Sequence, residues 1–308
     1  MADAAGHLGS CQLAFLVEGE ASLFEIGPTG WADAQSTREG DMAKLFAVTI
    51  IVIAIASAIP IVMHMWPMPQ DISTHGHLID EQYADTMAEA GISFLASQFL
   101  LGFFIWKFSR SKPGDKIKSF PGGATGMVVA AFLLVGTEAL ALGVFGTKAW
   151  ASVYFTPPSA NAMPIQVQAG QFAFYFRYPG ADGTFGPIHP EQISEANANF
   201  FGLDTTHDQD SKDDMVTAEM AIPVNREIHL LMHAKDVGHS FYVPELRVQQ
   251  DFVPGLDVSI HFTATKVGKY EIVCTQLCGL GHYNMKAYLE VKSQEDYDSW
   301  IKQQAALQ

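Results

Sequence analysis

Three long apolar segments occupy much of the first half of the chain. They are residues 45–66, 90–108 and 126–147. At about 1.5 Å of rise per residue, a helix of this length crosses the roughly 30 Å hydrocarbon core of a bilayer. Helices on the surface of a soluble domain show a polar face, which these segments hardly do, apart from Gln98 and the single acid Glu138. The pattern therefore predicts a three-span transmembrane region within residues 45–150.

The second half of the chain has a different pattern. Short, partly alternating runs rich in β-branched and aromatic residues are separated by Gly, Pro and Asn. Examples are residues 165–168, 172–176, 228–232 and 258–262. Many short strands with frequent turns are typical of an all-β sandwich. We expect residues 151–308 to form this domain, with a short amphipathic helix at 295–307.

Charge is distributed unevenly along the chain. The formal net charge is -15, and an acidic balance argues against a nucleic acid as partner. Residues 180–214 contain eight acids and one Lys, which predicts a long, solvated acidic insertion between strands. A calcium site at Asp204, Asp208 and Asp210 is the alternative, but the loop glycine and terminal Glu of such sites are missing.

The charges beside the apolar segments predict their orientation. Residues 107–118 are rich in Lys and Arg, whereas residues 67–90 carry acids and no Lys or Arg. Short basic loops stay on the cytoplasmic side, so the N-terminal segment 1–44 is expected inside and the β domain outside. Segment 1–44 lacks the basic n-region of a secretory signal. Whether the first span is retained or is a cleaved anchor stays open.

A set of soft and borderline metal ligands stands near the C-terminus. It consists of His239, Cys274, Cys278, His282 and Met285. A weak axial Met beside Cys and His is typical of copper, and two thiolates on one loop can bridge two copper ions. The alternatives are a zinc site with the same Cys and His donors, a disulfide between the cysteines, or coincident core residues.

Three motifs resemble those of subunit II of haem-copper cytochrome c oxidases. They are Cys-x3-Cys-Gly-x2-His-x2-Met from Cys274, Asp-Val-x-His-Ser-x-x-Val-Pro from Asp236, and Asp-Phe-Val-Pro-Gly from Asp251. The resemblance implies a cupredoxin-like sandwich with a dinuclear copper centre, CuA. Such a centre takes electrons from cytochrome c and passes them to haem in subunit I, where oxygen is reduced to water with proton translocation. It also implies a bacterial-type inner membrane location, with the CuA domain on the periplasmic face.

The resemblance assigns roles to individual residues. Cys274 and Cys278 are the expected bridging thiolates, with His239 and His282 as terminal ligands. The expected axial ligand is Met285, and Gln276 stands where the family supplies a backbone carbonyl. No catalytic residue is expected in this chain, because the oxygen chemistry belongs to subunit I. The expected partners are subunit I, other oxidase subunits, the lipid bilayer, and cytochrome c or a membrane-bound cytochrome.

Three departures from the family pattern alter these expectations. Gln276 replaces a Glu that also binds magnesium at the boundary with subunit I, and an amide is a poorer ligand for a hard cation, so that site is doubtful. Phe172 replaces the indole that usually receives the electron. The sequence also offers three spans where the common pattern has two.

Other residues are candidates for supporting roles. Asp236 either orients His239, faces a basic cytochrome or is a surface acid, and Tyr242 or Tyr283 is a possible donor contact in place of the missing indole. Glu138 is either functional, as intramembrane acids often are, or paired with a polar neighbour. The alternatives for the whole chain are a CuA-bearing subunit of a nitric oxide reductase and, less favoured, a copper-delivery protein.

Overall fold

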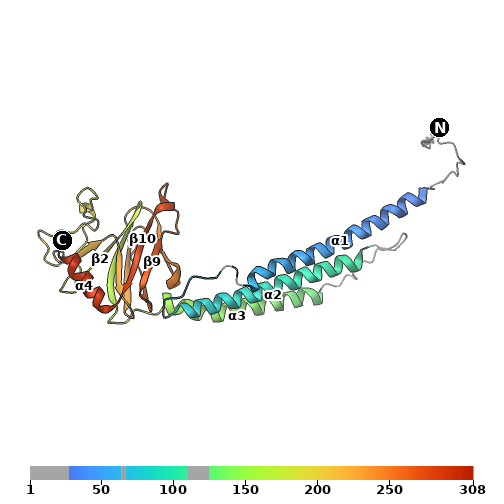
Figure 1. Cartoon of the computed structure of the whole chain (residues 1–308), viewed down its shortest axis with the longest axis horizontal. Helices are drawn as coiled ribbons and strands as arrows, with labels where there is room; N and C mark the ends of the chain where they lie inside the picture. Colours follow the sequence, from blue (N-terminus) through green and yellow to red (C-terminus); the bar gives the residue numbers. More distant parts are fainter. Residues whose placement is uncertain (1–27, 64, 66, 110–124, 308) are drawn as a thin grey trace, which may run out of the picture. The chain divides into compact units, whose positions relative to one another are not determined.

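The computed structural model describes residues 28–63, 65, 67–109 and 125–307, with side chains from residue 38 onward. It contains three long helices, α1 (Pro28–Val62), α2 (Gly76–Phe108) and α3 (Thr125–Tyr154), followed by a β domain and a C-terminal helix, α4 (Gln294–Ala305) (Figure 1). The predicted helix after the last strand is thus confirmed. The first 27 residues and most of the basic 107–118 segment lie outside the described residues.

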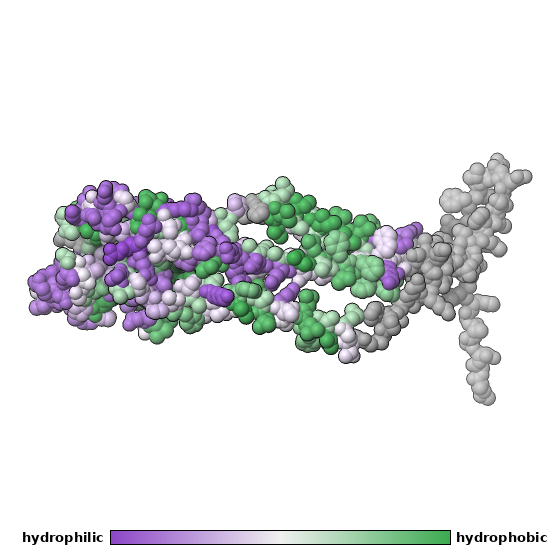
Figure 2. Space-filling model, turned by 90° about the horizontal axis from the view of Figure 1, so that it is seen from below, coloured by the Kyte–Doolittle hydropathy of each residue, from purple (hydrophilic) through white to green (hydrophobic). Residues whose placement is uncertain are grey.

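The three long helices have apolar surfaces. Each is long and apolar enough to cross a membrane, and apolar side chains gather on their surfaces in Figure 2, whereas the β domain is largely hydrophilic. Side chains such as Ile53, Phe132 and Leu133 are more than half exposed. This exposure is favourable only in an apolar solvent, because apolar surface is driven out of water.

Helix α2 begins earlier than the hydropathy pattern predicts. The expectation of an acidic loop over residues 67–90 is wrong for most of that range, because α2 starts at Gly76 and carries Asp80, Glu81, Asp85 and Glu89. Hydropathy detects the part of a helix that suits lipid. It does not detect a polar continuation of the same helix beyond the hydrocarbon region, and Glu and Ala are good helix formers.

The β domain is a sandwich of two five-stranded sheets. The first has the order β3 (Met215–Thr217), β2 (Ala173–Tyr178), β1 (Met163–Gly170), β5 (Glu227–Ala234) and β8 (Val258–Thr263). The second has the order β4 (Met220–Pro223), β10 (Lys286–Lys292), β9 (Gly268–Val273), β6 (His239–Val243) and β7 (Val248–Phe252). Strand pairs β1–β5 and β4–β10 are parallel and the others are antiparallel. The predicted cupredoxin-like fold class, a β-sandwich after apolar helices, is confirmed.

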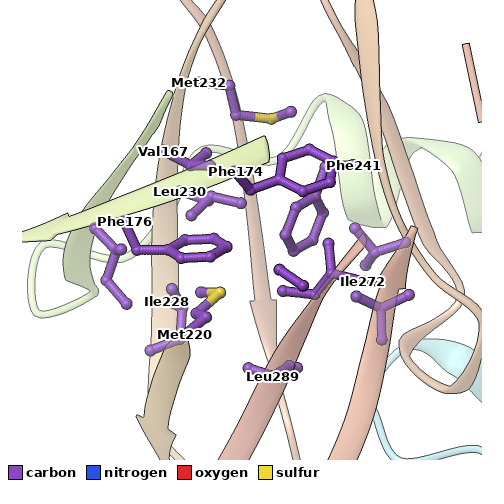
Figure 3. Packing of buried hydrophobic residues seen from close by; sticks show 14 of the residues in the cluster. Val167, Phe174, Phe176, Met220, Ile228, Leu230, Met232, Phe241, Ile272 and Leu289 are labelled. Carbon is purple, nitrogen blue, oxygen red and sulfur yellow. The ribbon is translucent and has the colours of Figure 1, made fainter. Parts of the chain in front are cut away.

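The core lies between the two sheets. Alternate residues of the strands point inward, so β5 buries Ile228, Leu230 and Met232 while the residues between them face outward. In Figure 3 Leu230 lies beside Phe174, and Ile228 lies beside Met220 and Phe176. Full burial of one such side chain contributes about 1.5–3 kcal/mol, so the sandwich is a rigid support for the loops at its ends.

The acidic insertion 180–214 is only partly solvated, which corrects the expectation. Its residues Phe201 and Asp214 are buried, and the carboxylate of Asp214 pairs with Arg177, a fully buried residue of β2. The Arg177 guanidinium also donates to the carbonyl of Gly186 at 2.7 Å. A buried guanidinium needs an anionic partner and hydrogen-bond acceptors, and the insertion supplies both. The insertion is therefore attached to the sheet through Asp214. A count of net charge cannot distinguish this buried acid from the exposed acids of the insertion.

The β-sandwich is joined to the start of α2 by a network around Arg247. The guanidinium of Arg247 bonds both carboxylate oxygens of Asp80 at 2.7 and 3.0 Å and the carbonyl of Pro69 at 2.7 Å. Residues 56–96 and the sandwich belong to one compact unit. The segment before α2 and the first turns of α2 are therefore bound to the β domain by charge-assisted hydrogen bonds. Backbone pairing of Ser73 with Ala264 adds a second attachment.

Candidate metal centre

The ligand loop connects β9 to β10 and carries five of the six predicted ligands, all except His239. Cys274 directly follows β9, and Met285 directly precedes β10. The backbone N–H of Cys274 donates to the carbonyl of Met285 at 3.2 Å, which closes the base of the loop. Because β9 and β10 are paired up to Val273 and Lys286, both ends of the loop are fixed by the sheet.

The sheet also brings His239 to this loop. His239 is the first residue of β6, which lies beside β9 and pairs with it at Tyr242 and Val273. One ring nitrogen of His239 and the sulfurs of Cys274 and Cys278 all lie within 4.8 Å of one another, and all three residues are buried. Residues that are 35 positions apart in the chain thus form one group of possible ligands.

The other predicted donors surround the same point. The Cys278 sulfur lies 3.9 Å from the Cys274 sulfur, 3.6 Å from Nδ1 of His282 and 3.7 Å from the Met285 sulfur. The carbonyl oxygen of Gln276 lies 3.1 Å from the Cys274 sulfur. The cysteines are free thiols, so the disulfide alternative is not realised here. Five side chains and one carbonyl therefore converge.

His239 is oriented as a metal ligand would be. Its Nε2 lies 2.8 Å from a carboxylate oxygen of Asp236, and its Nδ1 is buried without a hydrogen-bond partner among the described residues. With the proton on Nε2 the ring donates to Asp236, and the lone pair of Nδ1 is left free. A buried, unpaired polar atom costs about 1–3 kcal/mol. A metal ion at Nδ1 fits this group and would remove that cost.

Burial disfavours free thiolates at this site. Burial, together with the neighbouring Cys274, raises the pKa of the Cys278 thiol to about 11. Two thiolates so close together repel each other, and only a cation can hold both in the deprotonated form. Burial also acts to raise the pKa of Asp236. Hydrogen bonds from His239 and from the N–H groups of Gln171 and Val237 outweigh it and hold that pKa below its ordinary value.

The aromatic candidates near the site differ in exposure. Phe172 is 41% exposed and its ring packs on the ligand loop, because a Cβ added at Gly281 would lie 2.5 Å from the ring. Tyr283 is 90% exposed, and Tyr242 is only half-buried on β6. Phe172 and Tyr283 thus lie at the outer side of the ligand loop, and a role of either tyrosine or of Phe172 in donor contact stays a prediction.

One contact was missed by the sequence analysis. The side-chain amide of Gln171, in the turn between β1 and β2, donates to the carbonyl of Cys278 at 2.5 Å. The two residues are 107 positions apart, and no local signal marks such a pair. Gln171 therefore becomes a candidate only when the two sheets are brought together.

Glu138 lies in helix α3 and is far from the ligand loop in the sequence. The hydroxyl of Ser93 on α2 donates to its carboxylate on α3 at 2.6 Å. A polar neighbour of this kind lowers the cost of an acid within an apolar helix pair. A further role of Glu138 stays a prediction.

Comparison with known proteins supports the resemblance seen in the motifs. The family model for the periplasmic domain of cytochrome c oxidase subunit II matches residues 198–292. An alternative cytochrome c oxidase subunit 2 from Bradyrhizobium diazoefficiens is 28% identical over 84% of this chain and 91% of its own length. A cytochrome c oxidase subunit 2 from Thermostichus vulcanus is 42% identical over 30% of this chain and 28% of its own length.

A solved structure is similar as well. The periplasmic domain of subunit II of cytochrome oxidase from Bradyrhizobium japonicum is 24% identical, with a TM-score of 0.36, and covers 48% of this chain and 96% of that chain. The residues that the family model matches include the whole ligand loop and His239. The chain is thus similar to subunit II of cytochrome c oxidases, by the family model over residues 198–292 and by a relative matched over most of its length.

Proposed function

We propose that this chain is the electron-entry subunit of a haem-copper terminal oxidase and holds a dinuclear CuA centre. The two copper ions would be held by the thiolates of Cys274 and Cys278, the imidazoles of His239 and His282, the thioether of Met285 and the Gln276 carbonyl. When bound, the copper pair supplies a one-electron acceptor shared by two metals. Electrons come from cytochrome c and leave to haem in subunit I, where oxygen is reduced.

The single observation that carries this proposal is the buried group of His239, Cys274 and Cys278, in which one imidazole nitrogen and two thiol sulfurs lie within 4.8 Å of one another and Nδ1 of His239 has no hydrogen-bond partner among the described residues. Zinc has tetrahedral sites that are complete with two thiolates and two imidazoles. The Met285 sulfur at 3.7 Å from the Cys278 sulfur adds a fifth, soft donor, for which a zinc site has no use. Copper uses such a thioether as a weak axial ligand. The donor set therefore favours copper over zinc.

The protein's part in electron transfer is to hold these donors still. The ligand loop is closed by the bond from Cys274 N–H to the Met285 carbonyl, and its two flanking strands are paired. His239 is fixed by Asp236 and by its place at the start of β6. A site whose ligands are locked by surrounding bonds changes little in geometry when its charge changes, and this favours fast transfer.

The surface around the loop suits a protein partner. Leu277, Leu280 and Tyr283 are at least 79% exposed and lie next to the ligands in the chain. Exposed apolar groups of this size mark protein contact sites. The domain from residue 151 onward has more acids than bases, which favours a basic donor such as cytochrome c. A membrane-bound cytochrome held by other subunits is the other donor we consider.

The proposed arrangement in the cell follows from the apolar helices. Residues 45–150 form a three-span region in the bacterial inner membrane, and residues 151–308 form the domain on its periplasmic face. Gln276 serves the centre through its backbone carbonyl only, because its side-chain amide is a weak ligand for magnesium. We therefore expect no tight magnesium site at this residue.

The test is a metal analysis of the full-length chain, purified in detergent and reconstituted with copper. The expected result is two copper ions per chain, with a mixed-valence electron-paramagnetic spectrum in which one unpaired electron couples to both nuclei. Stoichiometric zinc after exposure to both metals, or one copper per chain with a one-centre spectrum, would contradict the proposal.

A further inference from the structure

The turn between β1 and β2 lies against the ligand loop although it belongs to the other sheet. Gly170 and Ala173 are paired, so the turn consists of Gln171 and Phe172 alone. The ligands come from the second sheet, His239 from the start of β6 and the others from the loop after β9. The turn is thus the point at which the first sheet reaches the candidate metal centre.

Gln171 makes one bond to each of the two ligand-bearing segments. Its backbone N–H donates to Oδ2 of Asp236 at 2.8 Å, and the other oxygen of this carboxylate lies 2.8 Å from Nε2 of His239. Its side-chain amide donates to the carbonyl of Cys278 at 2.5 Å. One residue therefore links the His239 segment to the Cys278 segment.

The packing around the turn fits this link closely. A Cβ added at Gly279 would lie 2.8 Å from the Gln171 amide nitrogen, and its φ of +137° is a conformation that other residues rarely adopt. A Cβ added at Gly281 would lie 2.5 Å from the Phe172 ring. Two glycines of the ligand loop thus allow the turn to approach its backbone, as glycine does wherever two chain segments come close.

We propose that Gln171 is a positioning residue of the copper centre, because its amide ties the Cys278 peptide to the Asp236–His239 pair and so fixes one bridging thiolate relative to one terminal imidazole. This inference rests on the proposed function and adds a residue to it that touches no metal. Gln171 as a residue is exposed, and its amide bond to Cys278 is part-buried. Its contribution is therefore to loop position and not to burial of the core.

The bond to Cys278 can be removed without disturbing the bond to Asp236. The latter uses the backbone N–H, which every variant at position 171 except proline retains. Gln171→Ala removes both the hydrogen-bond donor and most of the side-chain volume. Gln171→Glu keeps the shape but replaces the donor by an ionised acceptor, which faces the carbonyl of Cys278 and repels it. The pair of variants thus separates hydrogen bonding from packing.

The experiment measures copper release from the full-length chain in detergent to an excess of chelator. A net hydrogen bond of this kind contributes about 0.5–1.5 kcal/mol, so we expect Gln171→Ala to lose copper about two- to twelvefold faster than wild type. Gln171→Glu is expected to be at least as fast. The matched control is Gln294→Ala on α4, an exposed glutamine whose amide donates to Asp298 at 2.8 Å far along the chain from the ligands.

Two further readouts distinguish positioning from general stability. The copper hyperfine pattern is expected to change in both Gln171 variants while the thermal midpoint of the metal-free chain stays that of the control. In the metal-free chain, alkylation of Cys278 is expected to be faster in Gln171→Ala than in wild type, because the loop is held less firmly.

The outcomes separate this inference from the proposed function. If wild type itself fails to bind two copper ions, the proposed function fails, whatever the variants do. If wild type binds two copper ions and both Gln171 variants match Gln294→Ala in release rate, hyperfine pattern and alkylation, the positioning role of Gln171 is wrong. Rapid release in Gln171→Ala with wild-type release in Gln171→Glu would also overturn it, because shape and not the donated bond would then matter.

Discussion

Replacement of Asp236 is the most direct test of how the protein fixes the orientation and the protonated nitrogen of the His239 ring. Its carboxylate contacts Nε2 of His239 at 2.8 Å and accepts the N–H of Gln171 at 2.8 Å and that of Val237 at 2.7 Å. Replacing Asp236 with Ala leaves the His239 ring without the partner that fixes its proton on Nε2. The ring can then also carry its proton on Nδ1, and Nδ1 is no longer kept free to bind a metal.

The size of the effect follows from the geometry. Loss of a residue that orients a ligand typically lowers metal affinity about 10–100-fold, or about 1.4–2.7 kcal/mol. The Asp236 side chain is 27% exposed, so water partly replaces its bonds, and we expect a value near the lower end. Asp236→Asn keeps an acceptor oxygen but loses the charge, so its effect is expected to be smaller than that of Asp236→Ala.

The assay is equilibrium competition for copper between the full-length chain and a chelator of known affinity. The chain offers a matched control in Asp257, whose carboxylate lies 3.2 Å from Nδ1 of His233 and is 93% exposed. Asp257→Ala removes an Asp–His pair of the same domain and is expected to leave copper affinity unchanged. Equal affinities of Asp236→Ala and Asp257→Ala would refute the reasoning, because the contact with His239 would then have no consequence.

The pH dependence of this contact has a defined sign. The folded pKa of Asp236 lies below its ordinary value, so the ionised carboxylate stabilises the fold above the unfolded pKa of about 3.9. This contribution is lost as pH falls through the lower, folded pKa. Between pH 5 and 8 the difference in unfolding free energy between wild type and Asp236→Asn is therefore expected to be constant, and it should shrink only in acid.

Three other predictions concern the ligands and the acidic insertion. Cys278→Ser should leave at most one copper per chain, because one bridging sulfur cannot hold two metals together, whereas Met285→Leu should keep both and shift the reduction potential. Replacing the exposed acids Glu191 and Glu195 with Gln should slow association with a basic cytochrome c about two- to tenfold at low salt, and the difference should fade as salt rises. Asp214→Ala should lower the free energy of unfolding by about 3–5 kcal/mol, because it leaves the Arg177 guanidinium buried without its anion.

Each of these predictions has a result that contradicts it. Two copper ions in Cys278→Ser with none in Met285→Leu would reverse our ranking of the ligands. A salt-independent electron-transfer rate in wild type would mean that the acidic loop does not guide the donor, and a membrane-bound donor would then be preferred. For Asp214, the control is the adjacent, exposed Asp213; equal thermal midpoints for Asp213→Ala and Asp214→Ala would show that the buried pair contributes nothing.

The sequence alone determined the local elements and the list of candidate ligands. Apolar length marked the three spans, and period-two alternation marked strands such as β5, because both depend on which side chains water excludes. Five soft donors at fixed spacing marked the candidate centre, since the chemistry of a metal ligand resides in its residue type. Hydropathy could not mark the start of α2, because the first turns of that helix are polar.

Only the tertiary structure decided which donors meet and which residues hold them. His239 reaches the cysteines because β6 lies beside β9, and strand order is a long-range property that no local pattern contains. Asp236 was undecided from sequence between orienting a ligand and facing solvent, and its 2.8 Å contact with His239 favours the first, which stays a prediction. Asp214 and Gln171 gained their partners Arg177 and Cys278 through contacts across 37 and 107 positions of the chain. Such contacts depend on the tertiary packing of the chain. The roles of these residues therefore cannot be predicted from the local sequence.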